Sequence, residues 1–339
     1  MHIHMKLMKK LVTIAATAAV ALTCSTIPAT ADDALSASLS SDLPLASAPV
    51  ASEQVDHGDY TGPLPGSAAP FTQWGFPTGP EVGQEHDFYT AFAKAAVNYQ
   101  GQKPAGLNDF SCTSDKNPIV LIPATVMNVY DDYSKLVPAL RAQGYCVYGF
   151  NHNPGPIPGT AFAGDIRDSA RALGLVVDRV LEQTGAEKVT LVGHSQGGGV
   201  LPMYYLTKLG GDKKVDQLVG MAPCNHGTTV AGMFNANKFA HDLVGFVVGY
   251  SSQQQIVGSD LMREVYGNGP VTRPGIKYTF IASNTDMTVT PYTNSFVDEP
   301  GVTNVTVQDY YPSLITDHNN MAYYDEVINL TVKALEGSL

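Results

Sequence analysis

Basic residues are scarce in this chain of 339 residues, which has 20 Lys and Arg against 31 Asp and Glu. No lysine or arginine lies between Lys10 and Lys94. Nucleic-acid binding depends largely on contacts between basic side chains and phosphates. We therefore expect no nucleic-acid partner for so acidic a protein.

The apolar run near the N-terminus is too short to favour a membrane-spanning helix. It extends from Leu11 to Leu22, whereas a spanning helix needs about 20 residues. Three lysines precede this run, and the small residues Ala29-Thr30-Ala31 follow it. This order is typical of a secretory signal peptide, so we predict that residues 1–31 are cleaved near Ala31 and that the protein is secreted (extracellular).

Sustained hydrophobic periodicity is missing from residues 32–66, which are rich in Ser, Ala, Pro and Asp. We predict a disordered spacer or propeptide there. The remaining residues, 67–339, suit a single α/β domain. Without the signal peptide, 17 Lys and Arg would oppose 31 Asp and Glu. The resulting formal charge of −14 favours solubility outside the cell.

Cysteine is rare, and only Cys112, Cys146 and Cys224 follow the predicted signal peptide. Cys112 precedes the first strong strand pattern and Cys146 lies in the next one, so export favours a disulfide between them. Such a bridge would stabilise the fold by about 3–4 kcal/mol. Cys224 would then be unpaired, and we expect a buried, inert thiol there.

Motifs for a catalytic metal are absent from the sequence, which has neither H-E-x-x-H nor a clustered acidic loop. We therefore expect no metal and no other cofactor. No internal repeat and no obligate protein partner are evident.

What the sequence does contain is an alternation of apolar strand patterns with amphipathic helix patterns. We expect strands at Ile119 to Ile122, Tyr145 to Phe150, Val189 to Val192, Gln217 to Met221, Tyr278 to Ser283 and Val302 to Gln308. We expect helices at Tyr133 to Gln143, Ala163 to Thr184, Gly198 to Leu209 and Met321 to Leu335. This alternation favours an α/β fold with a mostly parallel central sheet and helices on both faces.

The pentapeptide Gly193-His194-Ser195-Gln196-Gly197 lies between a strand pattern and a helix pattern. A G-x-S-x-G sequence at such a turn is typical of the nucleophile elbow of α/β-hydrolases. The turn holds the serine in a strained conformation, and the residues two positions away must be small. It also directs N–H groups toward an oxygen that becomes negative during acyl transfer. We therefore predict that Ser195 is a catalytic nucleophile.

The general base is expected near the C-terminus, because the triad of this fold runs Ser, then Asp or Glu, then His. His318 is the only histidine after the last strong strand pattern, so we predict that it is the base. His226 and His241 also follow Ser195, but they precede the strand that should deliver the acid.

The acid should follow the carboxyl end of a strand. Asp286 comes three residues after the strand pattern that ends at Ser283. We predict that it orients the imidazole and stabilises its protonated form. Asp309 follows another strand pattern and is the second choice. The remaining candidates are Asp260, Asp298 and Glu299.

The oxyanion hole of such a site needs two donors. One should be the N–H of Gln196, the residue after the nucleophile. The other should come from the loop after the first strong strand, where Thr125 offers both its N–H and its hydroxyl.

Four segments together resemble the secreted class 2 lipases of bacteria and are similar to fungal lipase B. They are Asn117 to Thr125, Gly193 to Gly198, Ala222 to Thr228 and Thr285 to Pro291. The resemblance covers roughly residues 105 to 335 and implies an α/β-hydrolase catalytic domain. It also implies that Asp286, in D-x-x-V-x-P, is the triad acid, that His318 is the base, and that Cys112 and Cys146 are bridged.

The chain departs from this family in the predicted oxyanion loop. Relatives carry Gly after the Pro or His of that loop, where this chain has Ala124. If the position needs a positive φ, alanine costs about 1 kcal/mol, and the loop would be shaped differently. Relatives commonly have a histidine before the nucleophile, and we interpret His194 as packing behind the elbow.

The resemblance implies a secreted serine lipase or esterase that hydrolyses carboxylic esters of acylglycerols through an acyl-enzyme. The substrate would be a lipid or ester, met at an oil-water interface when it is emulsified. An acyltransferase or a polyester hydrolase with the same triad is the alternative. A non-catalytic binding protein is disfavoured, because Ser195, Asp286 and His318 are all present.

The expected acyl pocket draws on two apolar segments. Leu314 and Ile315 lie just before His318, and Phe246 and Val247 lie in the region from Thr228 to Gly275. That region is longer than a connection between two strands needs. It forms either a cap over the pocket or a helix buried against the edge of the sheet.

Overall fold

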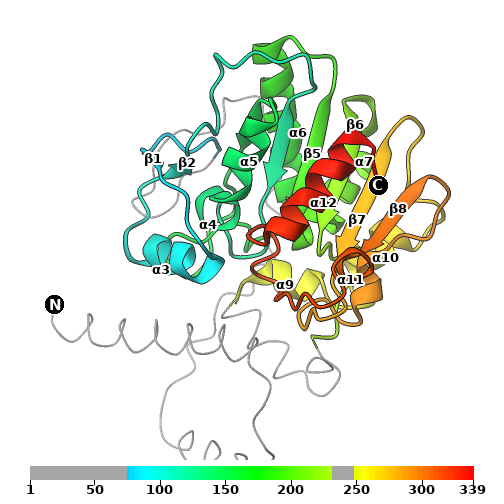
Figure 1. The fold of residues 1–339 in the computed structure, drawn as a ribbon. Coiled ribbons are helices and arrows are strands. Elements are labelled where there is room, and N and C mark those ends of the chain that lie inside the picture. Colours follow the sequence, from blue (N-terminus) through cyan, green and yellow to red (C-terminus); the bar gives the residue numbers. More distant parts are fainter. Residues whose placement is uncertain (1–74, 231–247) are drawn as a thin grey trace, which may run out of the picture. The chain divides into compact units, whose positions relative to one another are not determined.

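In the computed structural model of the chain, which describes residues 75–230 and 248–339, a parallel sheet of six strands forms the centre (Figure 1). The strands lie in the order β4-β3-β5-β6-β7-β8, and every neighbouring pair is parallel. Their bounds are β3 Ile119–Ile122, β4 Val147–Gly149, β5 Val189–His194, β6 Val215–Met221, β7 Lys277–Ala282 and β8 Val302–Thr306. The predicted parallel sheet is confirmed.

The described residues belong to one compact unit of the chain, Leu64–Leu339. The predicted signal peptide and spacer, residues 1–66, lie outside the described residues. A small parallel sheet of β1 (Glu81–Val82) and β2 (Lys103–Pro104) precedes the central one. The helices and 3-10 turns are α3 Phe88–Asn98, α4 Val129–Tyr133, α5 Leu136–Ala142, α6 Ile166–Thr184, η1 Ser195–Gly198, α7 Val200–Lys208, η2 Gly211–Lys213, α9 Tyr250–Gln254, α10 Asp260–Tyr266, η4 Tyr292–Ser295, α11 Val307–Tyr310 and α12 Asp325–Glu336.

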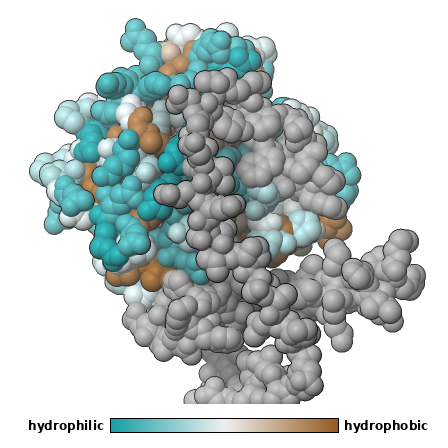
Figure 2. Space-filling model, turned by 180° about the vertical axis from the view of Figure 1, so that it is seen from behind, coloured by the Kyte–Doolittle hydropathy of each residue, from teal (hydrophilic) through white to brown (hydrophobic). Residues whose placement is uncertain are grey.

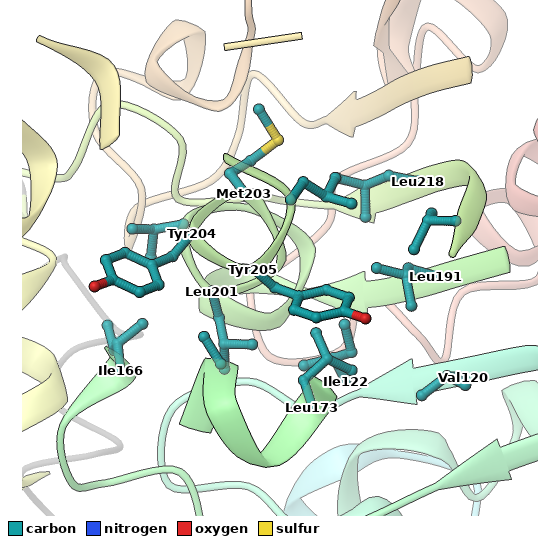
Figure 3. Close-up of a cluster of buried hydrophobic side chains, with 14 of the residues drawn as sticks. Val120, Ile122, Ile166, Leu173, Leu191, Leu201, Met203, Tyr204, Tyr205 and Leu218 are labelled. Atoms are coloured by element: carbon teal, nitrogen blue, oxygen red, sulfur yellow. The ribbon is translucent and has the colours of Figure 1, made fainter. Parts of the chain in front are cut away.

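Helices cover both faces of the sheet, because side chains alternate between the faces along each strand. In β3, Val120 and Ile122 join one buried hydrophobic cluster, and Ile119 and Leu121 join another. The first cluster also includes side chains of α6, α7 and α10, and Figure 3 shows part of it around α7. The second includes side chains of α4, α5 and α12. The predicted two-sided arrangement is therefore confirmed.

Local signals in the sequence set the ends of α6. The side chain of Asp165 accepts a hydrogen bond from the N–H of Arg167 and caps the first turn. Gly185 ends the helix with a φ of +71°, a conformation that glycine adopts without strain. The helix starts three residues later than the predicted Ala163, because this cap lies within the predicted range.

Two predicted elements are divided in the structure. The helix expected at Tyr133 to Gln143 is α5, which begins at Leu136, whereas Tyr133 ends the separate short helix α4, which Asn128 caps by a capping box with Asp131. The strand expected at Val302 to Gln308 ends at Thr306, and α11 begins at the next residue, Val307.

The cysteines are arranged as predicted. Cys112 and Cys146 form a disulfide with a sequence separation of 34 residues, and Cys224 is free and buried. The bridge ties the segment before β3 to the residue before β4.

The surface of the described part is mostly hydrophilic in the view of Figure 2, where hydrophobic residues form small separate patches. In residues 75–230 and 248–339, none of the helices is both long and apolar enough to cross a membrane. Most large apolar side chains of this part lie in the buried clusters around the sheet.

Candidate active site

Ser195 lies directly after β5, at the turn into η1, and α7 follows from Val200. Its φ is +55°, in the left-handed region where a residue with a side chain is strained. The residue is 6% exposed. The predicted strand, turn and helix are therefore present around the serine, and the serine has the backbone strain that a nucleophile elbow requires.

The glycines on either side of Ser195 are required by close backbone contacts. A Cβ on Gly193 would lie 1.8 Å from the carbonyl oxygen of Gly197. A Cβ on Gly197 would lie 2.0 Å from the carbonyl oxygen of Ile122, at the end of β3. No side chain fits at such distances, so the two glycines let the turn close and bring it against the loop after β3.

Asp286 and His318 meet at the carboxyl edge of the sheet. His318 Nδ1 lies 2.7 Å from Asp286 Oδ2, and both side chains are almost fully buried. Asp286 Oδ1 accepts hydrogen bonds from the N–H groups of Thr288 and Val289, at 2.7 and 3.0 Å. A carboxylate engaged on both oxygens is fixed in place and draws the imidazole proton to Nδ1. His318 Nε2 is then left as the basic nitrogen.

His194 connects the serine to the loop of His318. Its ring lies 5.0 Å from the ring of His318, measured between centroids, and its Nε2 is 2.9 Å from the carbonyl oxygen of His318. The carbonyl oxygen of Ser195 accepts a hydrogen bond from the N–H of Cys224, just after β6. Ser195 therefore lies after the carboxyl end of β5 and Asp286 after that of β7, with β6 between the two strands, and His318 reaches Asp286 from the loop after α11.

Thr125 and Gln196 lie in the two loops where oxyanion donors were predicted. Gln196 is the second residue of η1, and N–H groups at a helix start lack partners within the helix. Gln255 Nε2 donates a hydrogen bond to Thr125 Oγ1 at 2.7 Å. That bond occupies a lone pair of the hydroxyl, so its hydrogen remains available to another acceptor.

Ala124 fits the oxyanion loop without the strain considered above. It is not among the described residues with positive φ, and the left-handed residue of this loop is Val126, with a φ of +59°. The N–H of Ala124 donates to Asp132 Oδ2 at 2.8 Å. The loop therefore makes its sharp turn two residues after the position where relatives carry glycine.

Three residues around the site were not foreseen in these roles. Asp132 pairs with His194, which is hydrogen-bonded on both ring nitrogens rather than only packed behind the elbow. Gln255, from the end of α9, holds the hydroxyl of Thr125. The sequence offers no local pattern for these contacts, because the partners are 62 and 130 residues apart.

The other acidic candidates lie elsewhere. Asp309, Asp298 and Asp260 are exposed. Glu299 accepts hydrogen bonds from the N–H groups of Val271 and Thr272. None of these four makes the contact with His318 that Asp286 makes.

The alternative base His226 stacks on Tyr266, with 4.8 Å between ring centroids, and the pKa of its imidazole is lowered by burial. His241 lies outside the described residues.

The two predicted pocket residues that the structure describes, Leu314 and Ile315, differ in their exposure to solvent. Leu314 packs, partly buried, against the hydrophobic cluster on the α5 and α12 face, and Ile315 is 77% exposed. Phe246 and Val247 lie outside the described residues, as does most of the predicted cap. Ile315 is thus the one described member of the predicted pocket that leaves apolar surface open near His318.

No cluster of three or more His, Cys, Asp or Glu side chains suited to a metal occurs in the described residues. Cys224 lies near the site, where burial, aided by the Asp286 carboxylate, raises the pKa of its thiol to about 12. The predicted site residues supply a hydroxyl, an imidazole, a carboxylate and backbone N–H groups, which are the groups that acyl transfer uses.

Comparison with known proteins agrees with this fold. A family model described as the alpha/beta hydrolase fold matches residues 117–248. The structure is similar to that of lipase B from Aspergillus fumigatus, with a TM-score of 0.56 and 18% identity over 79% of this chain and 60% of that chain. It is also similar to the mature lipase BlEst2 from Bacillus licheniformis, with a TM-score of 0.49 and 17% identity over 66% of this chain and 94% of that one.

The chain thus spans less than two thirds of the Aspergillus protein, and at these identities the likeness concerns the fold. The strand order, the elbow after β5 and the matching family model agree with one another. The chain has the α/β-hydrolase fold, and this fold is similar to that of a fungal lipase B.

Proposed function

We propose that the chain is a serine hydrolase that cleaves carboxylic esters of acylglycerols through an acyl-enzyme on Ser195. The observation that carries the proposal is the 2.7 Å contact between His318 Nδ1 and Asp286 Oδ2. It is supported by the φ of +55° at Ser195 and by the packing of the adjacent His194 ring against the His318 ring. A carboxylate that orients an imidazole next to a serine on a strained turn is the arrangement that activates a hydroxyl for acyl transfer.

In the first half of the reaction, Ser195 Oγ attacks the ester carbonyl carbon while His318 Nε2 takes the hydroxyl proton. The bond between that carbon and the alcohol oxygen breaks, and His318 gives the proton to the departing alcohol. Water then attacks the acyl carbon while His318 Nε2 takes a proton from it. The bond between Ser195 Oγ and the acyl carbon breaks, His318 returns the proton to Oγ, and the carboxylic acid leaves. Asp286 stays ionised throughout and stabilises the imidazolium.

The negative oxygen of each tetrahedral intermediate would be held by the N–H of Gln196 and by the N–H and hydroxyl of Thr125. Each such donor contributes about 3 kcal/mol to transition-state stabilisation. The hydrogen bond from Gln255 supports this role, because it fixes the Thr125 hydroxyl as an acceptor on one side and leaves its hydrogen for the oxyanion.

The proposed substrates carry medium or long acyl chains. Ile315 is 77% exposed three residues before His318, and Met287 is 46% exposed next to Asp286, so apolar surface flanks the triad. Each CH₂ group that the site buries contributes about 0.8 kcal/mol, and the preference should rise with chain length until the pocket is full. The disulfide supports the secreted location, since such bridges persist outside the cytosol.

A substrate panel tests the proposal. Soluble short-chain esters and emulsified long-chain triacylglycerols are compared with wild-type protein, and Ser195→Ala is the blank for contaminating esterase. We expect the wild type to hydrolyse both classes. Hydrolysis of acetate and butyrate esters alone would show a short-chain carboxylesterase, and no hydrolysis of any ester would reject the proposal.

The predicted cap region has its own test. Phe246→Ser with Val247→Ser should lower triacylglycerol hydrolysis more than butyrate-ester hydrolysis, because less apolar surface would meet the acyl chain. Val97→Ser is a matched control, since Val97 is 83% exposed on α3. Equal losses on both substrates, in a protein that remains folded, would contradict an acyl-binding role.

A further inference from the structure

Two fully buried ionisable side chains, His194 and Asp132, form a hydrogen-bonded pair behind Ser195. His194 Nδ1 lies 2.8 Å from Asp132 Oδ1, and neither side chain is exposed to solvent. Asp132 belongs to α4, just after the oxyanion loop, and His194 is the last residue of β5. A buried ionic pair is a weak source of stability, since apolar residues of similar volume often do as well. Stability alone therefore does not explain why this buried pair is present.

Each member of the pair makes a second hydrogen bond, to the backbone of a different loop. Asp132 Oδ2 accepts from the N–H of Ala124 at 2.8 Å. His194 Nε2 lies 2.9 Å from the carbonyl oxygen of His318. A carbonyl oxygen only accepts, so Nε2 carries a hydrogen. A continuous chain of hydrogen bonds thus runs from the oxyanion loop, through the pair, to the loop of the proposed base.

A further proton lies between His194 Nδ1 and Asp132 Oδ1, because a lone pair would otherwise face a carboxylate. Burial acts to lower the pKa of His194, but the charge and hydrogen bond of Asp132 outweigh it, and the pKa is raised. The hydrogen bond between His194 Nδ1 and Asp132 Oδ1 is of the charge-assisted kind, which is shorter and stronger than a neutral one.

We propose that His194 and Asp132 are positioning residues, which hold the oxyanion loop and the His318 loop at a fixed separation on either side of Ser195. The inference rests on the proposed function. Neither residue touches the reacting atoms. They act through the backbone of Ala124 and His318, and a displacement of about 1 Å in such groups lowers turnover by roughly 10²-fold.

Three variants separate positioning from the presence of a buried charge. His194→Phe keeps an aromatic ring beside His318 but removes both N–H groups. Asp132→Ala removes the acceptor for Ala124 and the partner of His194. Asp132→Asn can keep every contact. Its amide oxygen Oδ1 can accept from the N–H of Ala124, and its Nδ2 can donate to Nδ1 of a neutral His194. Nε2 of that histidine still bears a hydrogen for the His318 carbonyl.

We expect His194→Phe and Asp132→Ala to lower kcat by about 10²-fold with little change in KM, since only the transition state depends on the alignment. Asp132→Asn should recover most of the lost kcat. Leu140→Ala, in the buried core of α5, is the control for stability loss and should keep kcat at temperatures where it is folded. Wild-type kcat in folded His194→Phe, or an equal loss in Leu140→Ala, would overturn the proposal.

A measurement on the wild type does not depend on whether the variants fold. In protein labelled with ¹⁵N-histidine, NMR should show a hydrogen on His194 Nε2 that exchanges slowly with water. The same signal should persist in Asp132→Asn and be absent in His194→Phe. A His194 Nε2 without hydrogen would overturn the proposal, because the bond to the His318 carbonyl could not exist.

A fluorophosphonate keeps this inference separate from the choice of substrate, because it modifies an activated serine without needing an ester. A wild type that is inactive in the ester panel but labelled at Ser195 would reject the proposed ester substrates alone. The labelling rates of the variants would then replace kcat as the readout. A wild type that neither hydrolyses esters nor is labelled would reject both proposals.

Discussion

At the scale of single residues, the two ring nitrogens of His318 have separate tasks in the proposed mechanism. Nδ1 is hydrogen-bonded to Asp286, and Nε2 would exchange a proton with Ser195. Because members of a triad act as a unit, Ser195→Ala and His318→Ala should each lower kcat for ester hydrolysis by roughly 10⁶-fold while the fold stays intact. Steady-state kinetics measure the loss of kcat, and circular dichroism checks that the fold is intact.

Asp286→Asn should lower kcat by roughly 10⁴-fold. The amide can still accept from the N–H groups of Thr288 and Val289, but its NH₂ group would face His318 and favour the wrong tautomer. Unchanged activity in this variant would remove Asp286 from the mechanism. Near-normal turnover in His318→Ala would remove His318 from the mechanism.

The thiol of Cys224 should be inert in the folded protein. Burial raises its pKa to about 12, so the thiol stays neutral below that pH. Alkylation by iodoacetamide should therefore be undetectable in native protein from about pH 7 to pH 10 and should appear once the chain is unfolded, because only the thiolate reacts. Labelling of native Cys224 at the rate of a free thiol would contradict its burial.

The sequence predicted the proposed triad more readily than the residues that support it. Ser195, Asp286 and His318 follow the fixed order of a fold whose strand ends carry the site, so each could be found from its place along the chain. Asp132 and Gln255 contact partners 62 and 130 residues away. Such contacts depend on how loops pack after folding, and no spacing in the sequence encodes them.

At the scale of elements, the elbow depends on backbone contacts that exclude any side chain. Gly197→Ala should destabilise the protein by more than about 3 kcal/mol, the upper end for overpacked sites, because its Cβ would lie 2.0 Å from the carbonyl oxygen of Ile122. Gly83→Ala is the matched control, since its Cβ would meet nothing within 4 Å. Urea unfolding of both variants decides the matter, and equal midpoints would show that the turn relaxes.

The strands were predicted more accurately than the helices around them. Ile119–Ile122 was found with its true bounds because a parallel strand buried on both faces is a short, continuous apolar run. The break between α4 and α5, and the start of α11 at Val307, were missed. Short helices at strand ends are determined by caps and tertiary contacts, and they contain too few residues to show a hydrophobic periodicity in the sequence. The helix α3 and the small sheet of β1 and β2 were not predicted at all.

At the scale of the whole molecule, the disulfide stabilises the fold without taking part in the site. Cys112 and Cys146 precede β3 and β4, at the amino ends of the strands. Replacing both by serine should lower the free energy of unfolding by about 3 kcal/mol and leave kcat of the folded protein unchanged. Urea unfolding followed by kinetics below the transition tests both expectations, and a large loss of kcat would place the bridge closer to the chemistry than the fold does.

The parallel sheet also gives the molecule two chemically different edges. Ser195 follows the carboxyl end of β5, whereas the amino ends carry lysines: Lys116 shortly before β3, Lys188 and Lys214 immediately before β5 and β6, and Lys277 at the start of β7. These four primary amines thus lie on the side away from the serine. An amine-reactive solid support that binds the protein through them would leave the serine turned toward the solution.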